Sequence, residues 1–258
     1  MERLNIEGWL EQAPPRETLI IRDDQYDLPE LQKIFYLSRK KKINIKLLDS
    51  GKLTSLELGT LTFTPFSFYT SDSVRKDFQE LVLLTGILRA KHCYSYYFIQ
   101  SELKSDSAIF NAPEIFKSVF ITNREERQNP ELLSRLSELA FRTGTAFVYY
   151  HHGNPEGTLA ENGHKGVWIH LSDKSFGQQN EDLIVDLARE MKKKGGQLVV
   201  HVDRGQEYYF LKRLSDNSCF LIFNLPVEHS SKIYALESYW QRRKLPEGAF
   251  YLYPHIIA

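Results

Sequence analysis

An internal repeat constrains the fold of this chain more than any other feature of its sequence. The segment that begins TLIIRDDQYDLPELQ aligns with the segment that begins SVFITNREERQNPELLS. Pro29-Glu30-Leu31 matches Pro130-Glu131-Leu132, and Ser71-Asp72 matches Ser172-Asp173, both at an offset of 101 residues. Self-similarity at a fixed period is typical of a fold built from one repeated unit. The fold should therefore divide into two halves of about 100 residues each.

Each half alternates short apolar runs, rich in β-branched and aromatic residues, with segments of helical pattern. Leu28–Lys40 and Pro130–Arg142 are two such segments, each with its apolar residues on one stripe, and Leu4–Gln12 indicates a short helix before the first strand. Strands that alternate with helices favour βαβ units and a parallel sheet. The expected strands are residues 18–22, 43–48, 61–70, 93–99, 118–122, 145–150, 166–171, 197–202, 219–223 and 249–253.

Four strands in each half predict an α/β fold with eight βα units. A chain of 258 residues has the length of a typical (βα)8 barrel. The last segment, CFLIFNLPVEHSSKIYALESYW onward, follows the same order of strand, helix and basic cluster and indicates a partial third copy. The two strands beyond eight leave an alternative open, in which two doubly wound α/β sheets follow each other in tandem.

The repeat also predicts how the chain is divided. We expect an N-terminal helical segment over residues 1–17, a first repeat over 18–116, a second over 117–218 and the partial third copy over 219–258. The polar stretch SELKSDSAIFNAP, at residues 101–113, separates the two halves. The repeats are expected to pack as one globular domain.

Composition excludes several classes of partner. The chain has 33 Lys and Arg against 33 Asp and Glu, for a formal net charge of zero, which makes nucleic acid an improbable ligand because phosphate contacts need an excess of basic residues. Residues 1–15 have no signal-peptide pattern, and no apolar run is long enough to cross a bilayer. We therefore expect a cytoplasmic protein without a membrane partner, in which self-association is possible.

Several polar residues have a structural interpretation. Ser71-Asp72 and Ser172-Asp173 occur in both halves between a strand and a helix, and are predicted to cap those helices. Pro29 and Pro130 are expected in the first turn of their helices. Basic clusters at the ends of helical patterns complement the helix dipole, and this accounts for them without a nucleic acid. They are Arg39–Lys42, Lys192–Lys194 and Arg242–Lys244.

The histidines follow a different pattern, because they are not repeated. Seven of the eight lie at or beyond position 151, and four of them lie at or beside the ends of the sixth to eighth strands. His152 corresponds to Ser50, His170 to Tyr69 and His201 to Phe98. Strand C-termini carry the active sites of α/β enzymes. A change to imidazole at three successive strand ends therefore predicts a functional site in the second half.

The residues at these strand ends suggest acid–base or metal chemistry. Imidazole with carboxylate is the usual ligand set for Zn, Mn or Fe ions, and the spacing of His201 and Asp203 puts both on one face of a strand. No nucleotide-cofactor motif is present. The predicted metal ligands are His151, His152, His170, His201, Asp203 and Asp23, and the predicted catalytic residues are His201, Asp203, His170 and Asp49.

The predicted function is that of a hydrolase or lyase with a divalent metal or a general acid–base site. Arg22, Arg124 and Arg204 follow strands and are expected to bind a small anionic substrate. The alternative is a non-catalytic α/β repeat scaffold or protein-interaction module without bound metal. The absence of a known catalytic motif favours that alternative.

Overall fold

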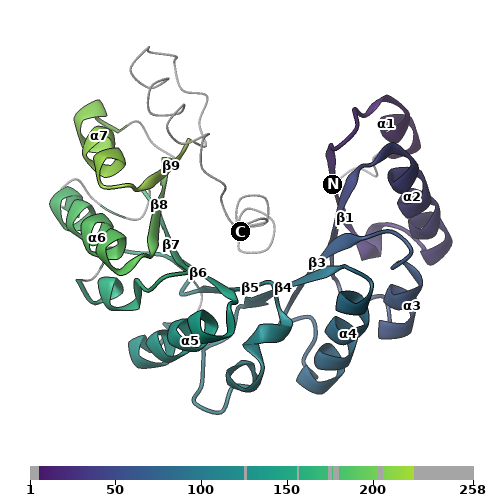
Figure 1. Cartoon of the computed structure of the whole chain (residues 1–258), viewed down its shortest axis with the longest axis horizontal. Helices are drawn as coiled ribbons and strands as arrows, with labels where there is room; N and C mark the ends of the chain where they lie inside the picture. Colours follow the sequence, from purple (N-terminus) through teal and green to yellow (C-terminus); the bar gives the residue numbers. More distant parts are fainter. Residues whose placement is uncertain are drawn as a thin grey trace. The chain divides into compact units, whose positions relative to one another are not determined.

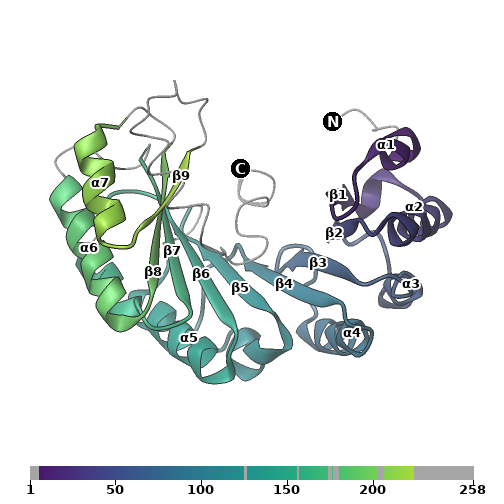
Figure 2. The same ribbon diagram turned by 45° about the horizontal axis from the view of Figure 1, so that its top comes forward.

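A computed structural model describes residues 6–124, 127–155, 157–173, 176, 180–202 and 206–223 of the chain. Strands and helices alternate as the repeat predicts, and Figures 1 and 2 show their arrangement. The strands are β1 (Thr18–Arg22), β2 (Asn44–Leu48), β3 (Phe66–Ser71), β4 (Tyr94–Ile99), β5 (Ser118–Thr122), β6 (Ala146–His151), β7 (Val167–Ser172), β8 (Gln197–Val202) and β9 (Phe220–Phe223). The helices are α1 (Ile6–Gln12), α2 (Leu28–Lys41), α3 (Ser55–Thr60), α4 (Phe78–Ala90), α5 (Pro130–Thr143), α6 (Glu181–Lys194) and α7 (Tyr208–Asp216).

The chain divides into two compact units. Of the described residues, the first contains those from 6 to 99 and from 115 to 118, and the second contains those from 100 to 114 and from 119 to 223. Short 3-10 turns, η1 (Asp23–Gln25), η2 (Ala108–Asn111), η3 (Pro113–Ile115) and η4 (Gly157–Asn162), connect the longer elements. The first unit holds β1 to β4 with α1 to α4, and the second holds α5 to α7 with the later strands.

The predicted α/β class with repeated βα units and parallel strands is confirmed. Neighbouring strands pair in parallel from β1 to β4 and again from β6 to β9, and the order of strands in the sheet is the chain order, as in a (βα)8 barrel. In each unit the helices lie on one face of its strands (Figure 1). The alternative of two doubly wound sheets is wrong, because that fold reverses its strand order and places helices on both faces.

Nine of the ten predicted strands are present, and the tenth, residues 249–253, lies outside the described residues. Of the predicted third copy, only β9 is described. The expected helices over 28–40 and 130–142 are confirmed as α2 and α5. Pattern analysis of the sequence did not find α3, which has only six residues.

The strand register agrees with the alignment of the two halves. Ser71 on β3 pairs with Phe98 on β4, and at the equivalent position Ser172 on β7 pairs with His201 on β8. Side chains alternate between the two faces of a strand, so a matched register puts equivalent residues on equivalent faces. His201 therefore occupies the position that Phe98 fills in the first unit.

The start of α2 and of α5 follows from the local sequence. The Asp27 carboxylate accepts a hydrogen bond from the backbone N–H of Glu30, and the Asn129 side chain accepts one from that of Glu131. These contacts satisfy backbone donors that have no partner within the helix. Proline lies in the first turn of both helices, as predicted for Pro29 and Pro130.

The predicted capping role of the two Ser-Asp pairs is wrong. Helix α4 begins after Asp77, whose carboxylate accepts from the backbone N–H groups of Gln79 and Glu80. Ser71 and Ser172 instead end β3 and β7. The following residues extend the sheet, since Asp72 N–H donates to the Phe98 carbonyl at 3.1 Å and Asp173 N–H donates to the His201 carbonyl at 3.0 Å. The backbone of the repeated pair thus continues the strand pairing by one residue.

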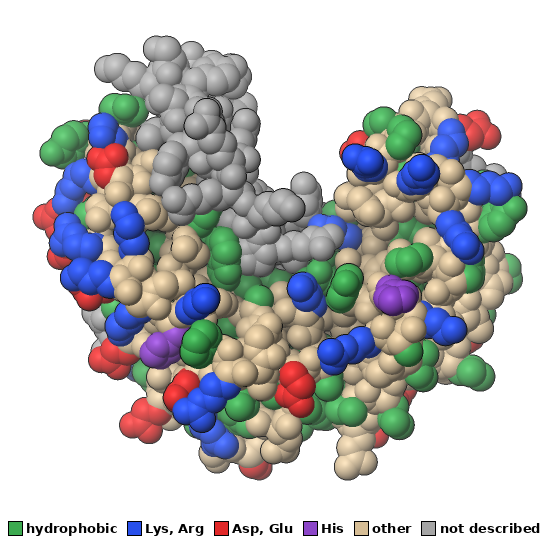
Figure 3. Space-filling model, in the orientation of Figure 1, with side chains coloured by type: hydrophobic (Ala, Val, Ile, Leu, Met, Phe, Trp, Pro, Cys, Tyr) green, Lys and Arg blue, Asp and Glu red, His purple; other side chains and the backbone are tan. Residues whose placement is uncertain are grey.

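The basic clusters lie where the sequence places them. The last turns of α2 and α6 contain Arg39–Lys41 and Lys192–Lys194, while Arg242–Lys244 lies outside the described residues. On α6, Lys193 pairs with Glu190 and Arg189 pairs with Asp186, both between exposed side chains. Figure 3 likewise shows basic and acidic side chains interspersed over the visible surface of α6 and α7. Within the described part of the chain, no helix is long and apolar enough to span a membrane.

Candidate functional site

Two buried histidines form a hydrogen-bonded pair in the second unit. His170 is the fourth residue of β7 and His201 the fifth of β8, and they are 1% and 4% exposed. His170 Nδ1 lies 2.9 Å from His201 Nε2. The two side chains share one face of the sheet, because Ser172, two residues after His170, pairs with His201 in the register. The structure thus brings together two of the predicted site residues.

The environment keeps His170 neutral. Burial, together with the neighbouring His201, holds the pKa of His170 well below its ordinary value of 6.5. A hydrogen bond between two neutral imidazoles needs one N–H and one bare nitrogen, so a single proton occupies the contact. The other ring nitrogen, His170 Nε2, is buried and has no hydrogen-bond partner among the described residues. A buried polar atom without a partner is costly, by about 1–3 kcal/mol.

Aromatic and aliphatic side chains surround the histidine pair. The Tyr150 ring on β6 lies 4.5 Å from that of His170, centroid to centroid, and Phe120 on β5 lies next to Tyr150 at 6.4 Å. Val199, which pairs with His170 in the register, is fully buried and packs with Phe220. Such surroundings shield the pair from bulk solvent and strengthen electrostatic interactions within the site. The pair is therefore a desolvated imidazole dyad.

The first unit shows what the repeat places at these positions when no histidine is present. Tyr69 on β3 corresponds to His170, and its ring stacks on Tyr96 at 4.4 Å with an interplanar angle of 11°. Phe98, the counterpart of His201, is 2% exposed. Aromatic packing is sufficient to stabilise this layer of the sheet. The second unit replaces two apolar or aromatic side chains by groups that exchange protons.

His151 and His152 belong to a separate cluster after β6. For His152, the backbone N–H donates to Asn123 Oδ1 at 2.6 Å and the carbonyl accepts from Asn123 Nδ2 at 2.9 Å. His151 Nε2 donates to the carbonyl of Asn154 at 3.0 Å, so in the neutral ring Nδ1 is the acceptor that faces Tyr149 Oη at 3.2 Å. These contacts join the loop after β5 to the end of β6.

Arg124 is a positive charge that acts on this cluster. Its charge, after the larger effect of burial, helps to lower the pKa of His152, and His151 contributes less. A positive charge beside a neutral imidazole at the end of parallel strands is suited to binding an anion. Of the three predicted substrate-binding arginines, Arg124 is the one that the structure describes in the second unit. Asp203 and Arg204 lie outside the described residues.

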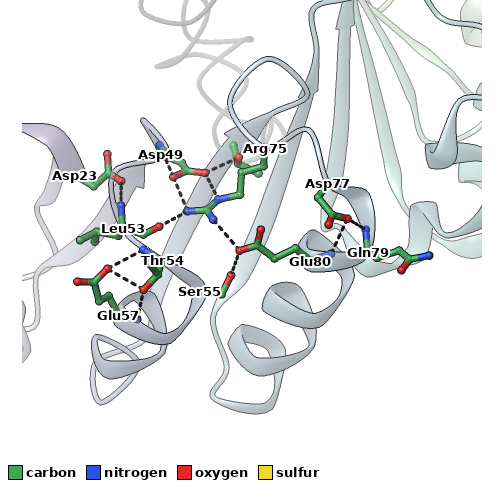
Figure 4. A network of polar contacts seen from close by, with 12 residues as sticks. Asp23, Asp49, Leu53, Thr54, Ser55, Glu57, Arg75, Asp77, Gln79 and Glu80 are labelled. Carbon is green, nitrogen blue, oxygen red and sulfur yellow. Dashed lines mark hydrogen bonds and ion pairs between the residues drawn. The ribbon is translucent and has the colours of Figure 1, made fainter.

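The acids predicted from the first half lie in the first unit, where they stabilise loops. Arg75 and Asp49 form a bidentate ion pair, with Nε 2.6 Å from Oδ2 and Nη2 3.0 Å from Oδ1 (Figure 4). Thr70 Oγ1 and the backbone N–H of Gly51 also donate to Asp49. Four donors thus occupy the two oxygens, which gives Asp49 a structural role in these loops. The catalytic role of Asp49 stays a prediction.

Asp23 and Arg22 are neighbours in sequence with different surroundings. Asp23 is fully buried, and its carboxylate accepts from the backbone N–H groups of Ser50 and Leu53 at 2.8 and 3.4 Å. Arg22 is exposed and forms an ion pair with Asp24 at 2.9 Å. Asp23 therefore orders the loop after β2, whereas Arg22 remains at the surface. Their roles as metal ligand and substrate ligand stay predictions.

The structure brings together only two of the predicted metal ligands that it describes. Among the residues that it describes, no three His, Cys, Asp or Glu side chains are grouped so that they could hold a metal ion. His170 and His201 come together, but His151 and His152 lie in the cluster with Asn123. A zinc site normally needs at least three protein ligands. A metal at the histidine pair thus depends on a ligand beyond the described residues, such as the predicted Asp203.

Sequence patterns missed two residues of these clusters. Arg75 lies 26 residues after Asp49, in a segment without a helical or strand pattern, so only the folded loops show their pairing. Gln197 begins β8, and its Oε1 atom is buried without a hydrogen-bond partner among the described residues. A polar residue at an alternate position of the apolar run QLVVHV was the available signal for Gln197.

We expect Asp23 to make the stability of the first unit depend on pH. Burial raises the pKa of Asp23 above its ordinary 3.8, more than the hydrogen bonds from Ser50 and Leu53 lower it. The folded state then binds the proton more tightly, so this contribution to stability is full below pH 3.8 and is lost as pH rises through the elevated pKa. Asp23→Asn should become more stable relative to the parent as pH rises, by about 1.4 kcal/mol for each pKa unit of elevation. Urea unfolding of both proteins across this range measures the effect, and a constant difference would contradict it.

Comparisons with known proteins give fold likeness only. No protein-family model and no curated protein matches the chain. Among solved structures, it is similar to the 3-dehydroquinate dehydratase of Aquifex aeolicus, with 11% identity over 89% of this chain and 100% of that chain and a TM-score of 0.38. A D-psicose 3-epimerase matches at 12% identity over 91% and 92% with a TM-score of 0.36, and a citrate synthase at 9% over 92% and 95% with a TM-score of 0.36. With sequence identities and TM-scores this low, the activities of those enzymes are not inferred for this chain.

Proposed function

We propose that this chain is an enzyme in which the His170–His201 pair transfers protons, in a hydrolase or lyase reaction on a small anionic substrate. The observation that carries the proposal is the 2.9 Å contact between His170 Nδ1 and His201 Nε2 in a buried, aromatic-lined environment. Proton transfer by a positioned imidazole is the commonest form of general acid–base catalysis. The position of His201 near the C-terminal end of β8 is where α/β enzymes bind their substrates.

The pair can exist in two neutral forms. In the first, His201 Nε2–H donates to His170 Nδ1, which leaves His201 Nδ1 as a base and His170 Nε2–H as an acid. The first form becomes the second in three proton movements. His201 Nδ1 takes up a substrate proton, the shared proton moves to His170 Nδ1, and His170 Nε2 releases its proton. In the second form His170 Nδ1–H donates to His201 Nε2. No net charge remains in the buried site after this sequence, so the desolvation penalty of a buried cation is avoided.

The anionic group of the substrate is assigned to Arg124. This residue follows β5, and its charge already acts on His152 after β6. A guanidinium binds carboxylate or phosphate groups in a bidentate manner. A divalent Zn, Mn or Fe ion at the histidine pair remains a further prediction, since its third ligand would have to come from outside the described residues.

The experiment is a turnover screen with phosphate monoesters, hydroxycarboxylates and carboxylate esters, monitored by product formation. Wild-type turnover that is lost in His201→Asn supports the proposal. Turnover that survives this substitution places the chemistry elsewhere. A wild-type protein that is inactive on every class contradicts the proposal and favours the non-catalytic alternative.

A second candidate function, a protein-interaction module, has one observation in its favour. Leu56 on α3 and Leu83 on α4 are 81% and 70% exposed, and Ile87 on α4 is 46% exposed. The two helices pack closely, because a Cβ atom on Gly59 would lie 3.8 Å from Ile87 Cγ2. Exposed apolar side chains that gather on neighbouring elements mark interaction surfaces. If they mediate self-association, Leu83→Glu should reduce the mass measured by light scattering to that of a monomer, whereas a wild-type monomer at all concentrations argues against it.

A further inference from the structure

A second buried polar atom lies on the same face of the sheet as the histidine pair. Gln197 Oε1 and His170 Nε2 are both buried, and neither has a hydrogen-bond partner among the described residues. Gln197, Val199 and His201 alternate along β8, so their side chains share one face. Two unpaired polar atoms on adjacent strands would together cost several times the energy of one hydrogen bond, about 1–3 kcal/mol for each atom.

The register places Gln197 on the side of His170 opposite to His201. His170 pairs with Val199, while Gln197 lies two residues earlier on β8 and His201 two residues later. Such diagonal neighbours on adjacent strands are within reach of long side chains. Because Nδ1 of His170 faces His201, its Nε2 atom, on the other side of the ring, points away from His201.

The side chains around these atoms are apolar. Gln197 pairs with Trp168 in the register, and the Trp168 ring lies 5.3 Å from that of Phe220. Val199 and Phe220 are buried in the same cluster. The Trp168 indole carries one N–H donor, but no described residue, Trp168 included, donates a hydrogen bond to Gln197 Oε1. A small polar molecule can fill that role.

We propose that one bound water molecule bridges His170 Nε2 and Gln197 Oε1, and that Gln197 is a positioning residue for the histidine pair. A carboxamide oxygen only accepts, so the occupant must donate to Gln197. His170 Nε2 donates in one neutral form of the pair and accepts in the other, so the occupant must be able to do both. Water meets both requirements, whereas an ammonium group only donates and a carboxylate only accepts. A polar site with at least two partners is where a buried water binds.

The water completes the proton path of the proposed function, on which this part of the inference rests. When His201 Nδ1 takes up a substrate proton, the shared proton moves to His170 Nδ1. In the same step the water oxygen takes the proton on Nε2, and one of the water's own protons passes to bulk water beside Gln197, which is half-buried at the start of β8. The bridging water therefore ends the step neutral. Gln197 keeps the water oriented by accepting its second O–H.

A crystal structure of the full wild-type chain that resolves ordered waters tests the proposal. We expect one oxygen within about 2.7–3.2 Å of both Gln197 Oε1 and His170 Nε2. Direct contact between the two side chains, or a site without this oxygen, overturns the inference. In Gln197→Met the oxygen should be absent, and in Gln197→Glu, which keeps an acceptor, it should return.

Nitrogen NMR of the histidine side chains separates a positioning role from a structural one. Gln197→Met should shift the His170 Nε2 resonance, Gln197→Glu should restore most of that shift, and Gln79→Met, at an exposed position on α4, should leave it unchanged. A His170 resonance that is identical in wild type and Gln197→Met overturns the inference. Both measurements are made without substrate, so they can fail while His201→Asn still abolishes turnover. They can also succeed while the proposed function fails.

Discussion

Replacing Arg75 with methionine should lower the free energy of unfolding of the first unit by about 3–5 kcal/mol. The guanidinium makes two hydrogen bonds to the Asp49 carboxylate and one, at 2.7 Å, to the carbonyl of Leu53. Both side chains of the ion pair are buried, with exposures of 8% and 0%. Methionine has a similar length but no donors, so the substitution leaves a buried carboxylate without its counter-ion. Denaturant unfolding of the purified variant measures the loss.

Arg22→Met in the same unit is the matched control. Arg22 also pairs with an aspartate, Asp24, but the two side chains are 49% and 41% exposed. Exposed ion pairs contribute about 0–1 kcal/mol, so this variant should unfold close to the wild type. Equal destabilisation by the two substitutions would show that burial of the Arg75–Asp49 pair has no special effect, and would contradict the structural role assigned to it.

His201→Asn should lower kcat/KM by about 10²–10⁴-fold on any substrate that the wild type turns over. Asparagine keeps a hydrogen-bonding side chain of moderate size, but it neither accepts nor releases a proton near neutral pH. The asparagine amide matches the Nδ1 position of the ring and does not reach His170 Nδ1, so the variant loses the titratable group and the contact together. The pH dependence of kcat/KM should flatten, because the imidazole that takes up the proton is gone.

His164→Asn controls for the loss of a histidine elsewhere in the second unit. The backbone of His164 forms an isolated bridge to Gly195, and that contact does not depend on its side chain. This variant should retain wild-type kcat/KM. A similar loss in both variants would indicate a general effect of substitution, and a normal rate in His201→Asn would exclude the pair from the chemistry.

The sequence was sufficient to predict the fold because the signals for it are local and repeated. Apolar runs and helical stripes predicted nine described strands and the helices α2 and α5. The alignment of the two halves, which allows for a short insertion before His201, also agrees with the register of Ser71 with Phe98 and of Ser172 with His201. The Ser-Asp prediction failed because a short polar residue after a strand can cap a helix or extend a ladder, and the distance to the helix start decides between them.

The site could be predicted only in part because its contacts depend on register between strands. The non-repeated histidines indicated His170 and His201, but their pairing requires that β7 and β8 be neighbours with Ser172 opposite His201. The ion pair of Asp49 could not be predicted because its partner, Arg75, lies in the loop that follows β3. Histidines at strand ends in a sequence are compatible with two side chains in contact and with a group of three or more metal ligands, so the sequence alone does not distinguish these arrangements.

The protonation state of His170 and His201 is the most direct test of the account. Nitrogen NMR of the labelled wild-type protein reports, for each ring, which nitrogen carries a proton and how this changes with pH. We predict a His170 that stays neutral below pH 6.5, with one proton shared between its Nδ1 atom and His201 Nε2. Two independent imidazoles that both become protonated near pH 6.5 would contradict the buried pair and the function proposed for it.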